Sequence, residues 1–264
     1  GTYQPRDYCV QYRETDLNFV TRLMEQYGIF YFFQHEEKKH TLILADAPSA
    51  HQPCPEQAQA RWEPQASGAL AEDVLTSVQL EQVYRSGKYA LTDYNFETPS
   101  TSLAAKVDTT IKVAGNDKYE FYDYPGEYAQ KKEGEATVRL RMEEEEAHYL
   151  KLSGNSTCRR FIAGYRFDLV DYVRPDMDGA YVLTEVHHMA SVGDTYTTGD
   201  AGGSSDYSNI FTCIPHAVPF RPPRVTPKPI VQGPQTAVVV GPKGQEIYVD
   251  KYGRVKIQFF WDRE

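Results

Sequence analysis

The segment 236–264 limits the possible folds more than any other part of this chain, because short β-rich runs alternate with glycine turns in it. Valines occupy positions 238–240, residues 241–244 are Gly-Pro-Lys-Gly, and a strand pattern resumes at residues 246–249. Between 254 and 261, apolar and polar side chains alternate with the period typical of a half-exposed strand. The pattern predicts two or three short strands. A five-stranded barrel needs a longer chain, so we expect the segment to be the beginning of an incomplete barrel.

The composition is that of a globular protein rich in tyrosine. The chain has 264 residues, a formal net charge of −9, 20 Tyr and 12 Phe. This length is enough for two modest domains, and the aromatic content favours strands. The negative charge argues against a broad surface for nucleic acid or anionic membranes, and no apolar run is long enough to span a bilayer. The chain begins at Gly1 without an initiator Met, so we expect further residues to precede it.

The four cysteines, Cys9, Cys54, Cys158 and Cys213, are scattered along the chain. They form no CxxC pair and have no spacing typical of metal ligands. Such a distribution favours free thiols in a reducing compartment, with a structural disulfide as the alternative.

The N-terminal region predicts a strand followed by a helix. Residues 7–13 alternate Tyr, Val and Tyr with polar side chains, which indicates a strand. Thr15 or Asp16 can cap a helix that continues to Tyr27 with apolar residues at helical spacing. Gly28 follows directly, at the position where a residue in the left-handed conformation commonly ends a helix.

The following residues predict two pairs of strands. Runs at 29–34 and 41–44 are joined by a charged turn. Strands are expected again at 74–84 and 88–95, with the turn between them at 85–87. Further strands are expected at 119–124, 149–155, 166–170, 181–189 and 211–214.

A second helix is predicted at 133–146, and it ends in the acidic run 143–146. Neighbouring like charges do not stabilise a helix, so we expect this run to be a solvated face, with a docking surface for a basic partner as the alternative. Residues 193–208 are rich in Gly, Ser, Thr and Asp and predict a loop. Residues 215–229 are dense in proline, which favours an extended, semi-rigid linker between domains.

Two short patterns suggest chemistry but fall short of a site. On a strand, Glu185 and His187 share a face and His188 points the other way, and two ligands do not make a zinc site. The pair Asp176 and Asp178 lacks the other ligands of a calcium loop. The sequence contains no nucleophile with a base and no convincing carboxylate pair, so we expect no catalytic, metal or cofactor site.

Two stretches resemble the VgrG family, the tip proteins of type VI secretion systems, which are related to the hub and needle proteins of contractile phage tails. The first comprises residues 6–33 and continues through 40–46, and the second comprises 241–264. A weaker match at 156–173 and 179–190 keeps the same order. The resemblance covers nearly the whole chain.

The resemblance implies a mainly β fold with a few helices. It implies a β-barrel-like hub region at 1–214 that lacks its first strands, a proline-rich linker at 215–230, and the first strands of an OB-fold-like barrel at 231–264. The residues that carry the family motifs are expected to be structural, and they are Gly28, Gly241, Gly244, Tyr248, Asp250, Tyr252, Gly253 and Trp261.

The implied function is mechanical and not enzymatic. The family forms a homotrimer that caps a tube of Hcp-like rings, contacts baseplate components, and carries effectors or a tip protein on parts that lie beyond Glu264. It is assembled in the bacterial cytoplasm and injected into the target cell, without a nucleic-acid partner, a cofactor or stable membrane insertion.

Two other functions stay open from the residues alone. One is a baseplate hub or tail-lysozyme component of a contractile phage. The other is an OB-type module for carbohydrate or nucleic acid, for which Lys251, Tyr252, Arg254 and Lys256 supply only a thin basic and aromatic surface.

Overall fold

The computed structural model describes residues 3–6, 8–64, 72–191, 206–245 and 247–263. Two α-helices and thirteen strands lie in these ranges. The helices are α1 (Asp16–Tyr27) and α2 (Lys131–Ala147). The strands are β1 (Phe30–Glu36), β2 (Lys39–Ala45), β3 (Gln59–Arg61), β4 (Leu75–Gln82), β5 (Lys88–Leu91), β6 (Ala105–Asp108), β7 (Glu120–Asp123), β8 (Leu150–Ser156), β9 (Arg166–Val170), β10 (Gly179–Ser191), β11 (Asp206–Pro215), β12 (Ala237–Val240) and β13 (Lys256–Phe259). Short 3₁₀ turns are η1 (Pro48–Ala50), η2 (Asn116–Lys118) and η3 (Pro175–Met177).

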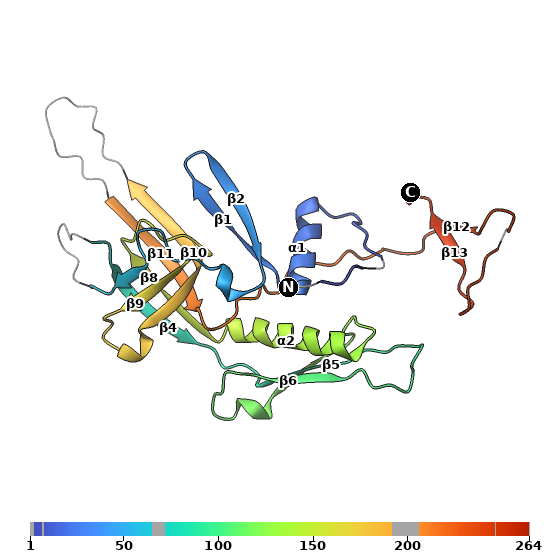
Figure 1. The fold of residues 1–264 in the computed structure, drawn as a ribbon, viewed down its shortest axis with the longest axis horizontal. Coiled ribbons are helices and arrows are strands. Elements are labelled where there is room, and N and C mark those ends of the chain that lie inside the picture. Colours follow the sequence, from blue (N-terminus) through green and yellow to red (C-terminus); the bar gives the residue numbers. More distant parts are fainter. Residues whose placement is uncertain (1–2, 7, 65–71, 192–205, 246, 264) are drawn as a thin grey trace.

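The main body is a six-stranded sheet with the order β3-β9-β10-β11-β8-β4. Its pairs are antiparallel except β3 with β9. A three-stranded sheet, β6-β5-β7, lies beneath α2, and β1–β2 and β12–β13 form separate hairpins (Figure 1). The expected mainly β fold with a few helices is confirmed.

The core lies between the six-stranded sheet and the inner face of the β1–β2 hairpin. Phe32 of the hairpin meets Tyr165, and Phe161, Phe167 and Phe211 pack against one another at 0% exposure. A smaller cluster between α2 and the three-stranded sheet buries its own set of side chains, which includes Tyr89, Leu91, Tyr128, Val138 and Met142. Each of the two sheets therefore has its own core, and α2 covers the three-stranded sheet.

The helix signals of the sequence are confirmed. The Thr15 hydroxyl oxygen accepts a hydrogen bond from the Asn18 amide at 3.2 Å, and Gly28 ends α1 with φ 66°, ψ 26°. α2 begins at a capping box in which Gln130 and Glu133 satisfy each other's amides. Among the residues that the structure describes, no helix is long and apolar enough to cross a membrane.

Three strand predictions are wrong. Residues 8–13 pair with no strand in the described ranges, because alternation alone supplies no hydrogen-bonding partner, and Arg13 has a φ of 47°, outside strand geometry (residue 7 lies outside the described ranges). The strands β4 and β5 do not pair with each other: β4 pairs with β8, and β5 pairs with β6 and β7. Residues 247–249 form only an isolated bridge, Val249 with Val255, and residue 246 lies outside the described ranges.

The remaining predicted strands are present with shifted ends. The strand expected at 211–214 belongs to the longer β11. Most of the loop expected at 193–208 lies outside the described residues.

Candidate functional site

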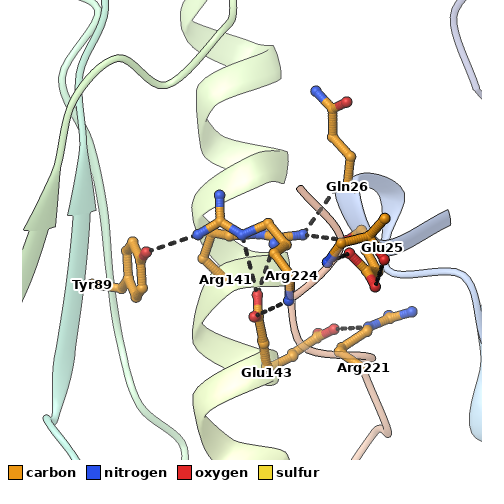
Figure 2. Close-up of polar contacts among 9 residues, drawn as sticks. Glu25, Gln26, Tyr89, Arg141, Glu143, Arg221 and Arg224 are labelled. Atoms are coloured by element: carbon orange, nitrogen blue, oxygen red, sulfur yellow. Dashed lines mark hydrogen bonds and ion pairs between the residues drawn. The ribbon is translucent and has the colours of Figure 1, made fainter. Parts of the chain in front are cut away.

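The most elaborate polar cluster lies at the C-terminal half of α2, where the proline-rich segment crosses it (Figure 2). We call residues 215–230 the strap. After β11 this segment has no regular secondary structure, because its prolines cannot donate ladder hydrogen bonds. Side chains from α1, α2 and the strap meet here, which makes the cluster the junction between the chain before residue 215 and the C-terminal hairpin.

The expectation that residues 143–146 form a solvated acidic face is wrong, because each of the four carboxylates has a partner within the chain. Glu143 and Glu145 pair with arginines at 2.8 and 3.3 Å, and Glu144 pairs with one at 2.7 Å. Glu146 accepts hydrogen bonds from the hydroxyls of Thr109 and Thr110. The arginine partners are Arg221 for Glu143, Arg141 for Glu144 and Arg85 for Glu145. The basic partner of this run is therefore the protein itself.

Arg141 ties the two helices together from a buried position. Its guanidinium donates to the carbonyl oxygens of Glu25 and Gln26 at 3.2 and 2.9 Å and forms an ion pair with Glu144. The carbonyls belong to the last turn of α1, where unpaired oxygens carry partial negative charge. Burial lowers the pKa of Arg141, and the Glu144 carboxylate opposes that shift. Arginine side chains stay protonated in proteins, so Arg141 caps the C-terminal end of α1 with a positive charge.

The strap is held along its length by four of its residues. Arg221 donates to the carbonyl oxygens of Gly28 and Asp46 at 2.9 and 2.7 Å as well as to Glu143. The backbone amide of Arg224 donates to Glu144 at 3.0 Å.

Farther along the strap, both the amide and the hydroxyl of Thr226 donate to the buried Glu25 carboxylate, at 3.0 and 2.8 Å. Lys228 pairs with Glu127. The segment that was predicted from the sequence to be a linker is thus bound to α1, to α2 and to the loop before α2.

The family-motif residues at the C-terminus form turns. Gly244 and Gly253 have φ of 88° and 79°, a region that side chains with a Cβ rarely adopt. A Cβ on Gly241 would lie 2.8 Å from the carbonyl oxygen of Gln245. Asp250 accepts from the amides of Tyr252 and Arg254, both at 2.9 Å, and these bonds lower the pKa of Asp250.

Two aromatic side chains of this segment contact the rest of the chain. Trp261 stacks on Phe259 and approaches Tyr12 with ring centroids 6.0 Å apart. Tyr252 meets Phe96 edge-on at 5.1 Å, and the Tyr252 hydroxyl donates to Glu97. Tyr248 is 42% exposed. The structure thus places Gly28 at the junction and the other motif residues in and around the C-terminal hairpin.

The two weak chemical patterns are structural turns and surface pairs. Glu185 pairs with His187 at 2.8 Å, while His188 contacts the Tyr207 hydroxyl. Asp176 pairs with Arg174. Asp178 Oδ1 accepts from the Tyr172 amide. Within the described ranges, no three His, Cys, Asp or Glu side chains gather as they would around a metal ion.

All four cysteines are free thiols. Cys9 is exposed, whereas burial raises the pKa of Cys54 to about 11 and that of Cys158 to about 12. Burial also raises the pKa of Cys213. These three thiols are core residues with little thiolate to react.

Sequence reasoning missed the junction because its parts are far apart in the chain. The usable signal was charge complementarity: an acidic run at 143–146 and the cations Arg221, Arg224 and Lys228 in the strap. Propensity and periodicity describe each element separately and do not pair one with the other.

Comparison with known proteins shows which protein family the chain resembles. A sequence profile of phage tail baseplate hub proteins (GPD) matches residues 1–194. The chain is 40% identical over 262 residues to the type VI secretion system spike protein VgrG1c of Pseudomonas aeruginosa, which covers 99% of this chain and 36% of that protein. It is 34% identical over 258 residues to the actin cross-linking toxin VgrG1 of Vibrio cholerae, covering 98% and 23%. The chain therefore spans roughly a third or less of the length of these curated relatives.

Solved structures share the fold. One is an E. coli protein, c3393, described as a component of the type VI secretion system that is structurally similar to the T4 phage tail proteins gp27 and gp5. It aligns with a TM-score of 0.56 at 19% identity, over 96% of this chain and 51% of its own. A tail protein from Neisseria meningitidis aligns with a TM-score of 0.52 at 12% identity, over 83% and 60%.

Proposed function

The chain belongs to the phage tail baseplate hub (GPD) family, and we propose that it is the hub part of the trimeric spike of a type VI secretion system. The observation that carries this proposal is the 40% identity, over 99% of the chain, to proteins named as spike proteins of that system. The fold alone supports only the broader hub role, because the solved relatives are too distant in sequence to add more.

The junction supports a mechanical role. A spike that is driven into a cell must transmit force between its parts without bending, and buried polar groups that are paired with one another add rigidity. Here four strap residues and Arg141 fix the hub region to the segment that leads to the C-terminal hairpin. This role requires no catalytic residue.

The domain division follows from this proposal. Residues 1–214 form the hub region, the strap at 215–230 crosses it, and 231–264 begin an OB-fold-like barrel. The hub is a homotrimer that rests on an Hcp-like ring and contacts baseplate components, and parts outside these residues carry an effector or tip protein. It assembles in the cytoplasm and is injected into the target cell.

A contractile-phage baseplate hub is the second candidate. The family profile is that of phage tail hubs, and a bacterial tail protein shares the fold. Sequence favours the secretion spike, because the curated relatives at 40% identity carry that name.

Deletion of the gene in the bacterium that encodes it separates the two candidates. A secretion spike is required for the tube protein to leave the cell, so the Hcp-like protein should disappear from the culture medium while its cellular level stays unchanged. The intact gene should restore secretion. Unchanged secretion together with loss of phage-like tail particles after induction would establish the phage hub instead.

Oligomeric state tests the trimer separately. The chain has a mass of 30.1 kDa, so three copies amount to about 90 kDa. Light scattering on the full-length protein should give three times the subunit mass, and a monomer at all concentrations would contradict the proposal.

A further inference from the structure

Two histidines face each other across the β1–β2 hairpin, one residue pair away from its turn. His35 on β1 and His40 on β2 are directly opposite in the strand register, next to the closing pair of Glu36 and Lys39. Their Nδ1 atoms lie 2.8 Å apart, and their ring centroids lie 4.8 Å apart. Figure 1 shows the turn at the free end of the hairpin. Both histidines are exposed, so the contact between them is open to ions from solvent.

The backbone of the hairpin brings the two rings together. Its turn has two residues, and such a turn closes on a pair that exchanges both backbone hydrogen bonds. The next pair, His35 with His40, is therefore a non-hydrogen-bonded pair, in which opposite side chains are closest. The two rings also project from the same face of the hairpin, because directly paired residues share a face. The site is thus assembled by the fold before any ligand binds.

The facing nitrogens are suited to chelation. In a neutral imidazole one ring nitrogen carries the proton and the other has a lone pair, so only one of the two Nδ1 atoms donates in this contact. When both rings carry their proton on Nε2, both Nδ1 lone pairs point into the space between the rings. A metal ion can then take the place of the shared proton. Rotation about χ2, a soft torsion in histidine, turns both lone pairs toward the ion.

The distance between the nitrogens favours Cu(II). Metal–imidazole bonds of about 2.0 Å that meet at a right angle hold their nitrogens about 2.8 Å apart, whereas a tetrahedral angle needs about 3.3 Å. Right angles are typical of tetragonal Cu(II) and Ni(II), and Cu(II) binds such ligands most tightly among the divalent first-row ions. Two ligands do not make a tetrahedral zinc site, but tetragonal Cu(II) accepts water at its remaining positions.

The surroundings of the pair leave it available to a cation. Residues 36–39 are Glu-Glu-Lys-Lys, so the charges of the neighbouring turn cancel. Among the hydrogen bonds of the described residues, this is the contact that joins two imidazoles. The other histidines with printed side-chain bonds contact oxygen atoms instead, and they are His51, His187, His188 and His216.

We propose that His35 and His40 form a binding site for Cu(II), which is held by both Nδ1 atoms and cross-links β1 to β2 beside the turn. Water completes the coordination. The inference goes beyond the proposed function and does not rely on it, because it rests on one contact within a single hairpin of this chain.

Calorimetric titration with CuSO₄ at neutral pH tests the site. Every sample carries Cys9→Ser, because an exposed thiol is itself a copper ligand. His35→Ala and His40→Ala should each bind Cu(II) at least about ten-fold more weakly than the parent, since the second imidazole acts at high effective concentration. ZnSO₄ should bind the parent at least about ten-fold more weakly than CuSO₄. Zinc binding as tight as that of copper would overturn the assignment to Cu(II).

Two control variants locate the ion. His187→Ala removes an exposed histidine that lies 2.8 Å from Glu185, and it should change the affinity by less than about two-fold. His40→Thr combined with Thr41→His keeps the composition but moves one ring to the opposite face of the hairpin. This variant should lose as much affinity as His40→Ala, and circular dichroism checks that all variants fold. If the loss follows His187, or if no variant binds more weakly, the copper is an adventitious ion only and the proposal is wrong.

Electron paramagnetic resonance counts the ligands of the bound Cu(II). Electron spin echo modulation should reveal the remote nitrogens of two imidazoles in the parent, and of one in His35→Ala and in His40→Ala. A single imidazole in the parent would mean that the ion does not cross-link the strands, and that result would overturn the proposal.

Discussion

At the scale of single residues, Gly28 meets two independent demands. Its φ of 66° is left-handed, and a Cβ there would lie 3.0 Å from Cδ of Arg221 and 3.2 Å from Cδ2 of Leu140. Gly28→Ala should therefore lower the free energy of unfolding by about 2 kcal/mol, of which about 1 kcal/mol is backbone strain. Gly233→Ala is the matched control, because φ is 74° and no atom lies within 4 Å. Urea unfolding measures both, and equal losses would show that packing against Arg221 does not matter.

Only the first of those demands could be predicted from sequence. A glycine after the last apolar residue of a helix predicts a left-handed cap by itself. That Arg221, 193 residues later, would donate to the Gly28 carbonyl depends on the folded chain and leaves no local trace. The burial of Arg141 at 2% exposure is equally hidden, since arginine in a helix is usually exposed.

At the scale of elements, the C-terminal hairpin depends on its neighbours. A two-stranded hairpin is marginal alone, and β12–β13 leaves Val238, Val239 and Ile257 between 44% and 50% exposed. Its attachments to the hub region run through Tyr12 and Phe96. The segment therefore gains order from contacts outside itself.

Removing one attachment should loosen the hairpin. Tyr12→Ala deletes the ring against Trp261 and the hydroxyl that accepts from Gln235. Amide hydrogen exchange at 237–240 and 256–259 should become about ten-fold faster, while the six-stranded sheet stays unchanged. Tyr94→Ala is the control, because that ring is 62% exposed. Unchanged exchange in the hairpin would mean that the Phe96 contact suffices.

Element type was predictable and element pairing was not. Caps and periodicity give α1, α2 and the β1–β2 hairpin from local sequence. The strands β4 and β5 follow one another like a hairpin, yet they join different sheets because their partners come from later in the chain. Residues 8–13 have a strand pattern without a partner. The pattern alone cannot distinguish a segment that pairs with another strand from one that does not.

At the scale of the whole molecule, the strap makes one body of parts that would otherwise be joined by a flexible segment. Proline limits its backbone, but stiffness alone does not fix a position. Arg221 fixes the strap in position. Its side chain is 11% exposed and bonds to α2, to the cap of α1 and to the carbonyl after β2. Three elements are thus held by one guanidinium.

Arg221→Met keeps most of the side-chain volume and removes those bonds. It also leaves Glu143, 20% exposed, without its cation. The free energy of unfolding should fall by about 3 kcal/mol, since breaking a largely buried pair is costly. Arg160→Met breaks the exposed pair with Glu56 and should cost less than about 1 kcal/mol.

A double-mutant cycle decides whether the pair itself carries the effect. If Arg221 acts mainly through Glu143, adding Glu143→Leu to Arg221→Met should recover about 1–3 kcal/mol of the loss in urea unfolding. Additive losses would show that the carbonyls of Gly28 and Asp46 are the important partners. If Arg221→Met costs no more than Arg160→Met, the strap is a spacer and rigidity across the junction has another source.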